Sequence, residues 1–257
     1  MMNEPEIISS VKNPKAVLWR SLKEAKGRKE HGAFLVEGLR LTGEALASSF
    51  PVQAVLLRKN FRPEVALPEG VPVFVLEDHV FASVCDTVSP QGIAAVLTMA
   101  PRPAEGPRLL ALDGIQDPGN LGTIVRTADA AGFTGLLMSR DCVSLFSPKV
   151  LRSAMGSVFR LGFDFPPSLS EALEAKKKEG FDVLSSQLDG DPFFERGPVS
   201  PSFVLVIGNE GNGVSEPVRR VATHHLRLPM AGGAESLNAA VAAGIMMYDL
   251  MRSASVG

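Results

Sequence analysis

Three polar segments interrupt the apolar C-terminal part of the chain, and each follows a stretch that is predicted to be a strand. They are "DPGNLGTIVRTADAAG" (117–132), "IGNEGNGVS" (207–215) and "LPMAGGAESLNAAVAAGIMMYD" (228–249). Within a helix and flanked by small residues, Arg126 can reach a phosphate or a carboxylate. The glycines around Glu210 permit positive φ and close approach of the backbone to a ligand. These residue types are suited to binding and orienting a polar ligand.

The polar side chains also need structural partners. A glutamate beside an apolar strand is rarely left unpaired, so Arg126 is the predicted partner of Glu210. Asn120 is predicted to cap the helix that follows the first segment, and Ser236 to cap the final helix. Taken singly, each segment is equally compatible with an ordinary capped helix or turn. Their occurrence in this order, at three strand ends, favours a shared site.

Alternating strand and helix patterns surround these segments. Strands are predicted at 109–115, 134–139, 160–165, 181–187, 202–208 and 224–229, mostly separated by helical stretches. Such an alternation predicts a parallel sheet covered on both faces. Ligands bind outside the carboxyl ends of parallel strands. The three polar segments are therefore expected to meet at one edge of the sheet.

The first hundred residues form a separate pattern. A basic, amphipathic helix is predicted near the N-terminus, and it is followed by a compact set of apolar strands and short helices. The segment "APRPAEGPR" (100–108) has the proline and glycine content of a linker. We therefore predict a small α/β domain over residues 1–100, a linker over 101–107 and a larger α/β domain over 108–257.

Composition excludes several classes of protein. The chain has 257 residues, 45% of them apolar and 21% charged, with a net charge of −2, so any contact with nucleic acid requires a local basic surface. Cys85 and Cys142 form no CxxC motif, and the four histidines have no metal-binding spacing, so no metal is expected. The N-terminal residues lack a signal-peptide pattern, and the longest apolar stretch is too short to span a bilayer. A cytoplasmic protein without membrane association is expected.

The three segments together resemble the motifs of the SpoU/TrmH family of RNA ribose 2′-O-methyltransferases, within the SPOUT superfamily. Residues 147–161, "SPKVLRSAMGSVFRL", resemble the family's segment between the first two motifs. This specific resemblance covers residue 108 to the C-terminus. Less specifically, "FLVEGLRLTGEAL" and "SPQGIAAV" resemble the small domain that binds RNA substrates in many members.

The resemblance implies a catalytic domain with a deep trefoil knot, a rare exception to the usual chain connections. It also implies a homodimer and S-adenosylmethionine as cofactor. The residues expected around the cofactor are Gly208, Asn209, Glu210, Gly211, Leu228, Pro229, Met230, Ser236, Leu237 and Asn238. The expected catalytic residues are Asn120, Arg126, Glu210, Ser236 and Asn238. The expected RNA contacts are Lys12, Lys15, Arg20, Lys23, Arg28, Lys29 and Arg152.

By the same resemblance, the reaction is methylation of a ribose 2′-hydroxyl. Because a guanidinium is effectively always protonated, we interpret Arg126 as a clamp for the neighbouring phosphate rather than as a base. The separate N-terminal domain favours ribosomal RNA over transfer RNA as substrate. Two other hypotheses stay open: a non-catalytic RNA-binding or assembly protein with the same fold, and methylation of a base nitrogen.

Overall fold

The structure is a computed structural model that describes residues 5–254, and the chain divides into two compact units. The first unit contains the chain up to Ala100 together with Phe146–Phe159. The second contains Pro101–Leu145 and the chain from Arg160 onward. The segment Phe146–Phe159 thus packs in the first unit, although the sequence pattern assigns it to the domain that begins at residue 108.

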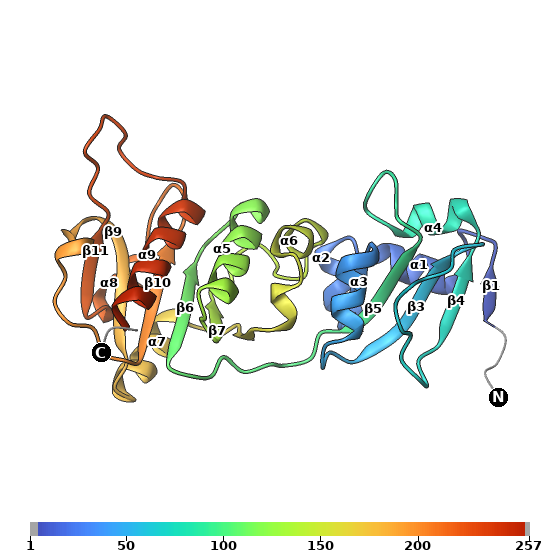
Figure 1. Cartoon of the computed structure of the whole chain (residues 1–257), viewed down its shortest axis with the longest axis horizontal. Helices are drawn as coiled ribbons and strands as arrows, with labels where there is room; N and C mark the ends of the chain where they lie inside the picture. The colour runs from blue at the N-terminus through green and yellow to red at the C-terminus, as the bar shows by residue number, and fades with distance from the viewer. Residues whose placement is uncertain (1–4, 255–257) are drawn as a thin grey trace. The chain divides into compact units, whose positions relative to one another are not determined.

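The first unit is a mixed sheet with short helices (Figure 1). Its sheet order within the described residues is β1-β4-β3-β5-β2, in which β1, β3 and β4 run parallel while β5 is antiparallel to β3 and β2. The strands are β1 (Glu6–Ile8), β2 (Ala33–Glu37), β3 (Val52–Arg58), β4 (Val73–Leu76) and β5 (Ile93–Thr98). The helices are α1 (Pro14–Ser21), α2 (Ala25–His31), α3 (Leu39–Leu46), α4 (Asp78–Val84), α6 (Pro148–Ala154) and the 3-10 turn η1 (Ser157–Phe159).

The basic N-terminal segment forms two helices, whereas the sequence pattern predicts one. Asn13 caps α1 by accepting from the backbone N–H of Lys15, and Pro14 occupies the first helical position. Beyond Ser21 the chain turns into α2, where Gly27 lies directly against the end of α1. A Cβ at Gly27 would stand 2.2 Å from the Ser21 carbonyl oxygen, so only glycine permits this close packing.

The second unit is built on a sheet whose adjacent strands are all parallel, as the alternation predicts. In the described part of the chain its order is β11-β9-β10-β6-β7-β8. The strands are β6 (Arg108–Asp113), β7 (Gly135–Met138), β8 (Gly162–Asp164), β9 (Asp182–Pro192), β10 (Phe203–Gly208) and β11 (His224–Arg227). The helices are α5 (Pro118–Ala130), α7 (Leu169–Lys178), α8 (Glu216–Val221), α9 (Ala239–Ala254) and the 3-10 turn η2 (Phe193–Glu195). The trefoil knot stays a prediction.

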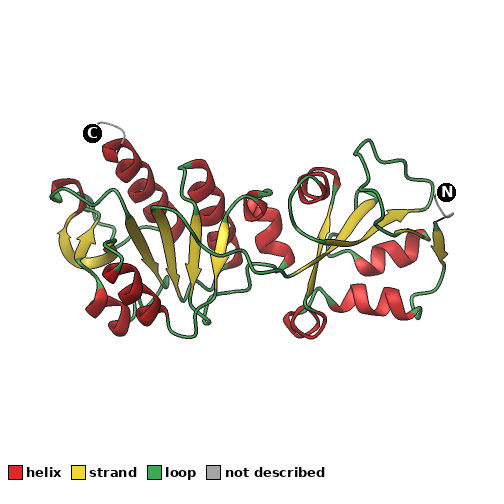
Figure 2. Cartoon of the chain, turned by 90° about the horizontal axis from the view of Figure 1, so that it is seen from below, coloured by secondary structure: helices red, strands yellow, loops and turns green. Residues whose placement is uncertain are grey.

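Helices cover both faces of this sheet, as Figure 2 shows. Leu109, Ala111, Val204 and Val206 pack with residues of α7 and α8 in one apolar cluster. Because side chains alternate along a strand, the intervening residues Leu110, Leu112 and Leu205 face the opposite side. They are also fully buried. A sheet buried on both faces explains why its strands are continuously apolar.

Residues 101–107 do not form a free linker, because they pack along β7 and β8. The backbone N–H of Ala104 donates to Asp164 Oδ2 at 2.9 Å, and Arg102 forms a β-bridge with Phe163. Ala104 is itself buried. The proline-rich composition therefore marks where the second unit begins rather than a flexible spacer.

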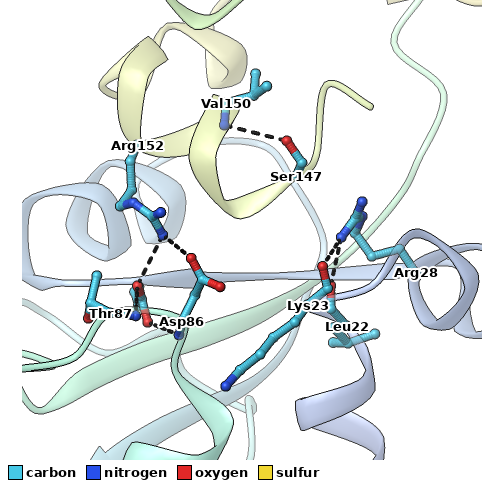
Figure 3. A network of polar contacts seen from close by, with 9 residues as sticks. Leu22, Lys23, Arg28, Asp86, Thr87, Ser147, Val150 and Arg152 are labelled. Atoms are coloured by element: carbon cyan, nitrogen blue, oxygen red, sulfur yellow. Dashed lines mark hydrogen bonds and ion pairs between the residues drawn. The ribbon is translucent and has the colours of Figure 1, made fainter. Parts of the chain in front are cut away.

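The segment Phe146–Phe159 is fixed in the first unit by aromatic packing and by one charged cluster. Phe146 lies 4.6 Å from Phe34 between ring centroids, and Phe159 packs edge-on against Phe50. Figure 3 shows the cluster, in which Arg152 Nη1 contacts the Asp86 carboxylate at 2.8 Å. The same nitrogen lies 3.4 Å from Glu37 Oε1.

Glu37 is the centre of this cluster, because its buried carboxylate also accepts hydrogen bonds from two backbone N–H groups. They belong to Asp86 and Thr87, at 2.8 and 3.0 Å, and so hold the loop that follows α4. One carboxylate thus joins β2, that loop and α6.

Replacing Glu37 with glutamine is expected to destabilise the first unit by about 2–4 kcal/mol, because a donor NH₂ group would replace one of the acceptor oxygens and leave donors unpaired in a buried site. Urea unfolding monitored by circular dichroism measures the change. Glu30→Gln, at an exposed position of α2, is the matched control and should change stability by less than about 0.5 kcal/mol. Equal behaviour of the two variants would contradict a structural role for Glu37.

Candidate functional site

The sheet order brings the three polar segments to one edge. β6 and β10 are neighbours with Asp113 opposite Gly208, so the loops that leave these two strands start side by side. On the other side of β10 lies β9, whose outer neighbour is β11, and the third segment leaves β11. The chain reverses direction across the sheet between β6 and β10, which is where parallel α/β sheets form ligand sites.

A relay of side chains connects the three segments. Asn238 Nδ2 donates to Asn120 Oδ1 at 2.9 Å, and Asn120 Nδ2 donates to Glu210 Oε1 at 3.0 Å. Each of the three residues comes from a different segment. The loops after β6, β10 and β11 are therefore held together by direct hydrogen bonds.

Helix capping differs from the sequence expectation and makes this relay possible. Asp117, not Asn120, caps α5 by accepting from the backbone N–H of Asn120, with Pro118 at the first helical position. Asn238, not Ser236, accepts from the first free N–H groups of α9, those of Ala240 and Val241. Because Asp117 takes the capping position, the Asn120 amide is left for the relay.

Glu210 is held by partners that differ from the predicted one. Its carboxylate accepts from Asn120 and from the backbone N–H groups of Gln116 and Asp117, at 3.3 and 3.2 Å. Burial acts to raise the pKa of Glu210, but these hydrogen bonds outweigh it and lower the pKa below its ordinary value. Glu210 is therefore ionised at neutral pH and stabilises the start of α5. Its stabilising contribution is present above its unfolded-state pKa and is lost as the pH falls through its folded-state pKa. The predicted pair of Glu210 with Arg126 stays a prediction.

Asn209 shapes the glycine-rich loop. Its Nδ2 donates to the Gly114 carbonyl at 2.7 Å, which ties the loop to the end of β6. Its Oδ1 accepts from the backbone N–H groups of Gly211 and Asn212, both at 2.9 Å. Nearby, Asp113 Oδ2 accepts from Ser215 N at 2.7 Å and closes the same loop from its far end.

Beside the relay lies a cavity of about 450 Å³ at the carboxyl ends of β10 and β11 and next to the middle of β9. Apart from Pro229 and Asn238, all residues predicted to surround a cofactor line it, namely Gly208, Asn209, Glu210, Gly211, Leu228, Met230, Ser236 and Leu237. Backbone, apolar side chains and a few polar groups alternate in its wall. This is the composition of a site for a mid-sized organic ligand.

Several lining residues were missed by the sequence reading. They are Ser186, Gln187, Leu188, Ile207, Gly213, Arg227, Glu235, Ala239 and Ala242. The first three lie in the middle of β9, just beyond its pairing with β10, in a stretch without glycine or charged residues. Its position beside β10 is the signal, and that position is not visible before the strand order is known.

Arg126 lies exposed on α5, the helix that contributes Asn120 to the relay. Ser236 is exposed in the third segment and lines the cavity. The predicted catalytic residues therefore all belong to the second unit, and Asn120, Glu210 and Asn238 are brought into direct contact.

The predicted RNA contacts divide by burial. Lys12, Lys15 and Lys29 are exposed, while Arg20 and Lys23 are half-buried and donate to backbone carbonyls of Val11 and Ser83. The prediction that Arg28 contacts RNA is wrong, because Arg28 is only 4% exposed. Its guanidinium donates to the carbonyls of Leu22 and Lys23, and so provides hydrogen-bond partners for the backbone carbonyl groups just beyond α1. Arg152 is paired with Glu37 and Asp86, and its RNA contact stays a prediction.

Other chemistries find little support in the described residues. No group of three or more histidine, cysteine, aspartate or glutamate side chains in residues 5–254 is placed to hold a metal ion. Cys85 is free and buried, and burial raises its pKa, so its thiol stays protonated. Over the same range, no helix is long and apolar enough for a membrane span.

Comparisons with known proteins match both units. The profile described as "SpoU rRNA Methylase family" matches residues 107–248, and that described as "MRM3-like substrate binding domain" matches residues 13–95. The chain is 38% identical over 244 residues to the 23S rRNA (guanosine(2553)-2′-O)-methyltransferase RlmP of Bacillus subtilis (strain 168), covering 95% of this chain and 98% of the relative.

Solved structures show the same likeness. The AdoMet-bound rRNA methyltransferase from Sinorhizobium meliloti is 29% identical with a TM-score of 0.85, covering 97% of this chain and 98% of that one. The SpoU methyltransferase AviRb from Streptomyces viridochromogenes, in complex with AdoMet, is 27% identical with a TM-score of 0.85, covering 96% of this chain and all of that one. Both similarities extend over nearly the whole chain.

Proposed function

The chain belongs to the SpoU rRNA methylase family, and on that premise we propose that it transfers a methyl group from S-adenosylmethionine to a ribose 2′-hydroxyl of ribosomal RNA. The observation that carries the proposal is the relay Asn238–Asn120–Glu210 beside the cavity. It joins the three family motifs into one polar wall next to a space suited to an organic cofactor.

The cavity fits the cofactor in size and in lining. Its volume of about 450 Å³ lies in the usual range for organic ligands. Gly208 lies so close to the backbone of Gly213 and Val214 that a Cβ has no room, so the loop folds tightly at the cavity wall. Leu228, Met230 and Leu237 supply apolar surface, and Asn209 holds the loop in shape. When bound, S-adenosylmethionine supplies an electrophilic methyl group on its sulfonium sulfur.

The protein's task is then to position the 2′-oxygen in line with the methyl carbon. The oxygen forms a bond to that carbon, the carbon–sulfur bond breaks with its electron pair going to sulfur, and the hydroxyl proton leaves to solvent. Asn120 and Asn238, fixed by the relay, orient the hydroxyl. Ser236 adds a further polar group at the cavity.

Arg126 promotes loss of the proton without accepting it, because a guanidinium is effectively always protonated. Its planar donors suit a phosphate, and a phosphate held beside the target ribose positions the 2′-hydroxyl. The positive charge of Arg126 also stabilises the developing alkoxide. The ionised Glu210 supports this arrangement by fixing the start of α5.

Ribosomal RNA is favoured as the substrate class by two of the comparisons. The relative RlmP is described as acting on 23S rRNA, and the first unit matches a substrate-binding domain. Exposed Lys12 and Lys29 provide positive charge on that unit, whereas Lys15 is ion-paired with Glu6. Transfer RNA is the second candidate.

The test is methyl transfer from radiolabelled S-adenosylmethionine to unmodified 23S rRNA, 16S rRNA, transfer RNA and assembled ribosomal subunits in parallel, followed by digestion to nucleosides. We expect label in one 2′-O-methylated nucleoside from 23S rRNA. Label on a base would exclude the ribose 2′-hydroxyl as the methylated group. Label only in transfer RNA would exclude ribosomal RNA as the substrate. No label in naked RNA or in assembled ribosomal subunits, with cofactor binding intact, would favour the non-catalytic alternative.

We also propose that the protein is a homodimer that buries one face of α9. Val241, Ile245 and Tyr248 recur along that helix at helical spacing and are 52%, 38% and 55% exposed. An apolar stripe on a helix of this kind marks a protein-binding surface.

Free cysteines and a ribosomal substrate are compatible with the proposed cytoplasmic location.

Replacing Ile245 with lysine is expected to convert the dimer to a monomer, because a charge would be buried without a partner at the centre of the stripe. Light scattering during size-exclusion chromatography measures the mass, which should fall by half. Val17→Lys, at an exposed apolar position of α1, is the matched control and should keep the dimer mass. An unchanged mass for Ile245→Lys would exclude this face of α9 as the interface.

A further inference from the structure

A second cavity, of about 660 Å³, lies at the opposite edge of the second unit from the candidate active site. It is formed where β6 and β10 begin, where α9 ends and along the loop that follows η2. Figure 1 shows the lower ends of β6 and β10 beside the C-terminal end of α9. The strand β10 has six residues, so about 20 Å of sheet separates this cavity from the first one.

Positive charge dominates the wall of this cavity. Among the described residues, three arginines, Arg108, Arg196 and Arg252, line it together with the carboxylate of Asp249, so the charge of these four side chains sums to +2. Asp249 contacts Arg196 at 2.7 Å and accepts from Arg252 at 2.8 Å. One carboxylate therefore neutralises only part of the charge that faces the cavity.

Arg108 and Arg196 are not solvated surface residues. The Arg196 side chain is only 7% exposed, and it donates to the Phe193 carbonyl and stacks over the Phe193 ring at 4.2 Å. Arg108 Nε is buried and has no hydrogen-bond partner among the described residues. Burial of Nε keeps a ligand away from that atom, so Arg108, which is half-buried, offers the cavity only its remaining exposed surface.

An aromatic ring completes the site. Phe194 lines the cavity, is 56% exposed, and is held edge-on by Phe193 with 5.4 Å between ring centroids. An exposed ring that is fixed from below is suited to stacking against a nucleobase. Guanidinium groups beside it match the geometry of a phosphate.

We propose that this cavity is a second nucleotide-binding site for the RNA substrate, with a phosphate on Arg108 and Arg252 and a base stacked on Phe194. The inference rests on the proposed RNA substrate and deepens it. The site lies away from the residues that handle the methyl group. It would hold a single-stranded nucleotide several positions away from the target nucleotide, while the target ribose lies beside the relay and the cofactor occupies the first cavity.

Binding of a labelled, mixed-sequence single-stranded 15-mer RNA, followed by fluorescence anisotropy at several salt concentrations, tests the proposal. Phe194→Ala is expected to weaken binding about tenfold, in line with the loss of one stacked base. Arg108→Gln should weaken binding and reduce the slope of log affinity against log salt by about 0.7, the value for one phosphate contact on single-stranded RNA. Arg108→Lys should restore the slope but only part of the affinity.

Arg220→Gln, an exposed arginine on α8, is the matched control and should bind the RNA like the wild type. Equal affinities for Phe194→Ala, Arg108→Gln and this control would overturn the proposal. Binding of inorganic phosphate that depends on Arg108, with RNA affinity unchanged, would assign the cavity to a small phosphate ligand instead and also overturn it. Competition by polyglutamate as strong as by RNA would favour an acidic protein segment and likewise count against it.

Methyl-transfer kinetics separate this proposal from the proposed function. With a methylated RNA in hand, Phe194→Ala should raise KM for that RNA and leave the Kd for S-adenosylmethionine unchanged. If the wild-type protein methylates no RNA, the proposed function is wrong. The anisotropy measurements still test whether RNA binds at the second cavity. Dimer mass is checked for each variant, because α9 carries both Arg252 and the proposed dimer stripe.

Discussion

Replacing Arg126 with alanine is expected to lower kcat for RNA methylation by about 100- to 1,000-fold, the usual effect of removing one group that stabilises developing charge. The residue lies exposed on α5, and the same helix presents Asn120 to the relay. Because Arg126 does not line the cofactor cavity, the Kd for S-adenosylmethionine should be unchanged. A large loss of kcat with intact cofactor binding is the signature of a group that acts on the RNA.

Single-turnover methyl transfer with saturating cofactor measures this loss, and calorimetry measures cofactor binding. Arg126→Lys keeps the charge but loses the planar fork, so it should retain more activity than Arg126→Ala, by about tenfold. Arg220→Ala, on α8, provides a control for loss of an exposed arginine and should react like the wild type. Turnover of Arg126→Ala within a few-fold of the wild type would remove Arg126 from the mechanism.

Replacing Gly208 with alanine is expected to weaken S-adenosylmethionine binding about 100-fold or more, which corresponds to about 2.8 kcal/mol. A Cβ at this position would lie 2.3 Å from Gly213 C and from Val214 N. Both are backbone atoms of the same glycine-rich loop, so the loop itself must move. That loop carries Asn209, Glu210 and Gly211, which all line the cofactor cavity.

Calorimetric titration measures the affinity of Gly208→Ala, and near-ultraviolet circular dichroism establishes that the variant is folded. Gly232→Ala is the matched control, since a Cβ there meets no atom within 4 Å. It lies in the third segment and should bind the cofactor normally. Wild-type affinity in a folded Gly208→Ala protein would show that the close approach of the loop does not shape the cofactor site.

The order and composition of the polar segments could be recognised without a structure. Residue type determines what Asn120, Glu210 and Asn238 are able to bind, and their positions after apolar strands place them at the carboxyl edge of a parallel sheet. The family resemblance gave eight of the seventeen residues that line the candidate cofactor cavity. The continuous apolar strands around Leu110 and Val204 also indicated a sheet buried on both faces.

Partnerships between distant residues could not be obtained in this way. Asp117 and Asn120 are both good N-cap residues, and the choice between them depends on where α5 begins after the loop from β6. Arg28 has the charge of an RNA contact, yet it is buried because α2 turns back against the end of α1. Arg152 pairs with carboxylates more than sixty positions away.

The sequence by itself determined the parallel sheet, because strand and helix periodicity are local patterns, and it identified the family, because the three polar segments resemble known family motifs. Only the tertiary structure decided which strands are neighbours, and hence that β9 supplies Ser186 and Gln187 to the cofactor cavity. It also placed Arg108, Arg196 and Phe194 in one cavity at the other edge of the sheet. The physical reason is that hydrogen-bond register and side-chain packing are set by contacts between segments far apart in the chain, and local sequence carries no record of them.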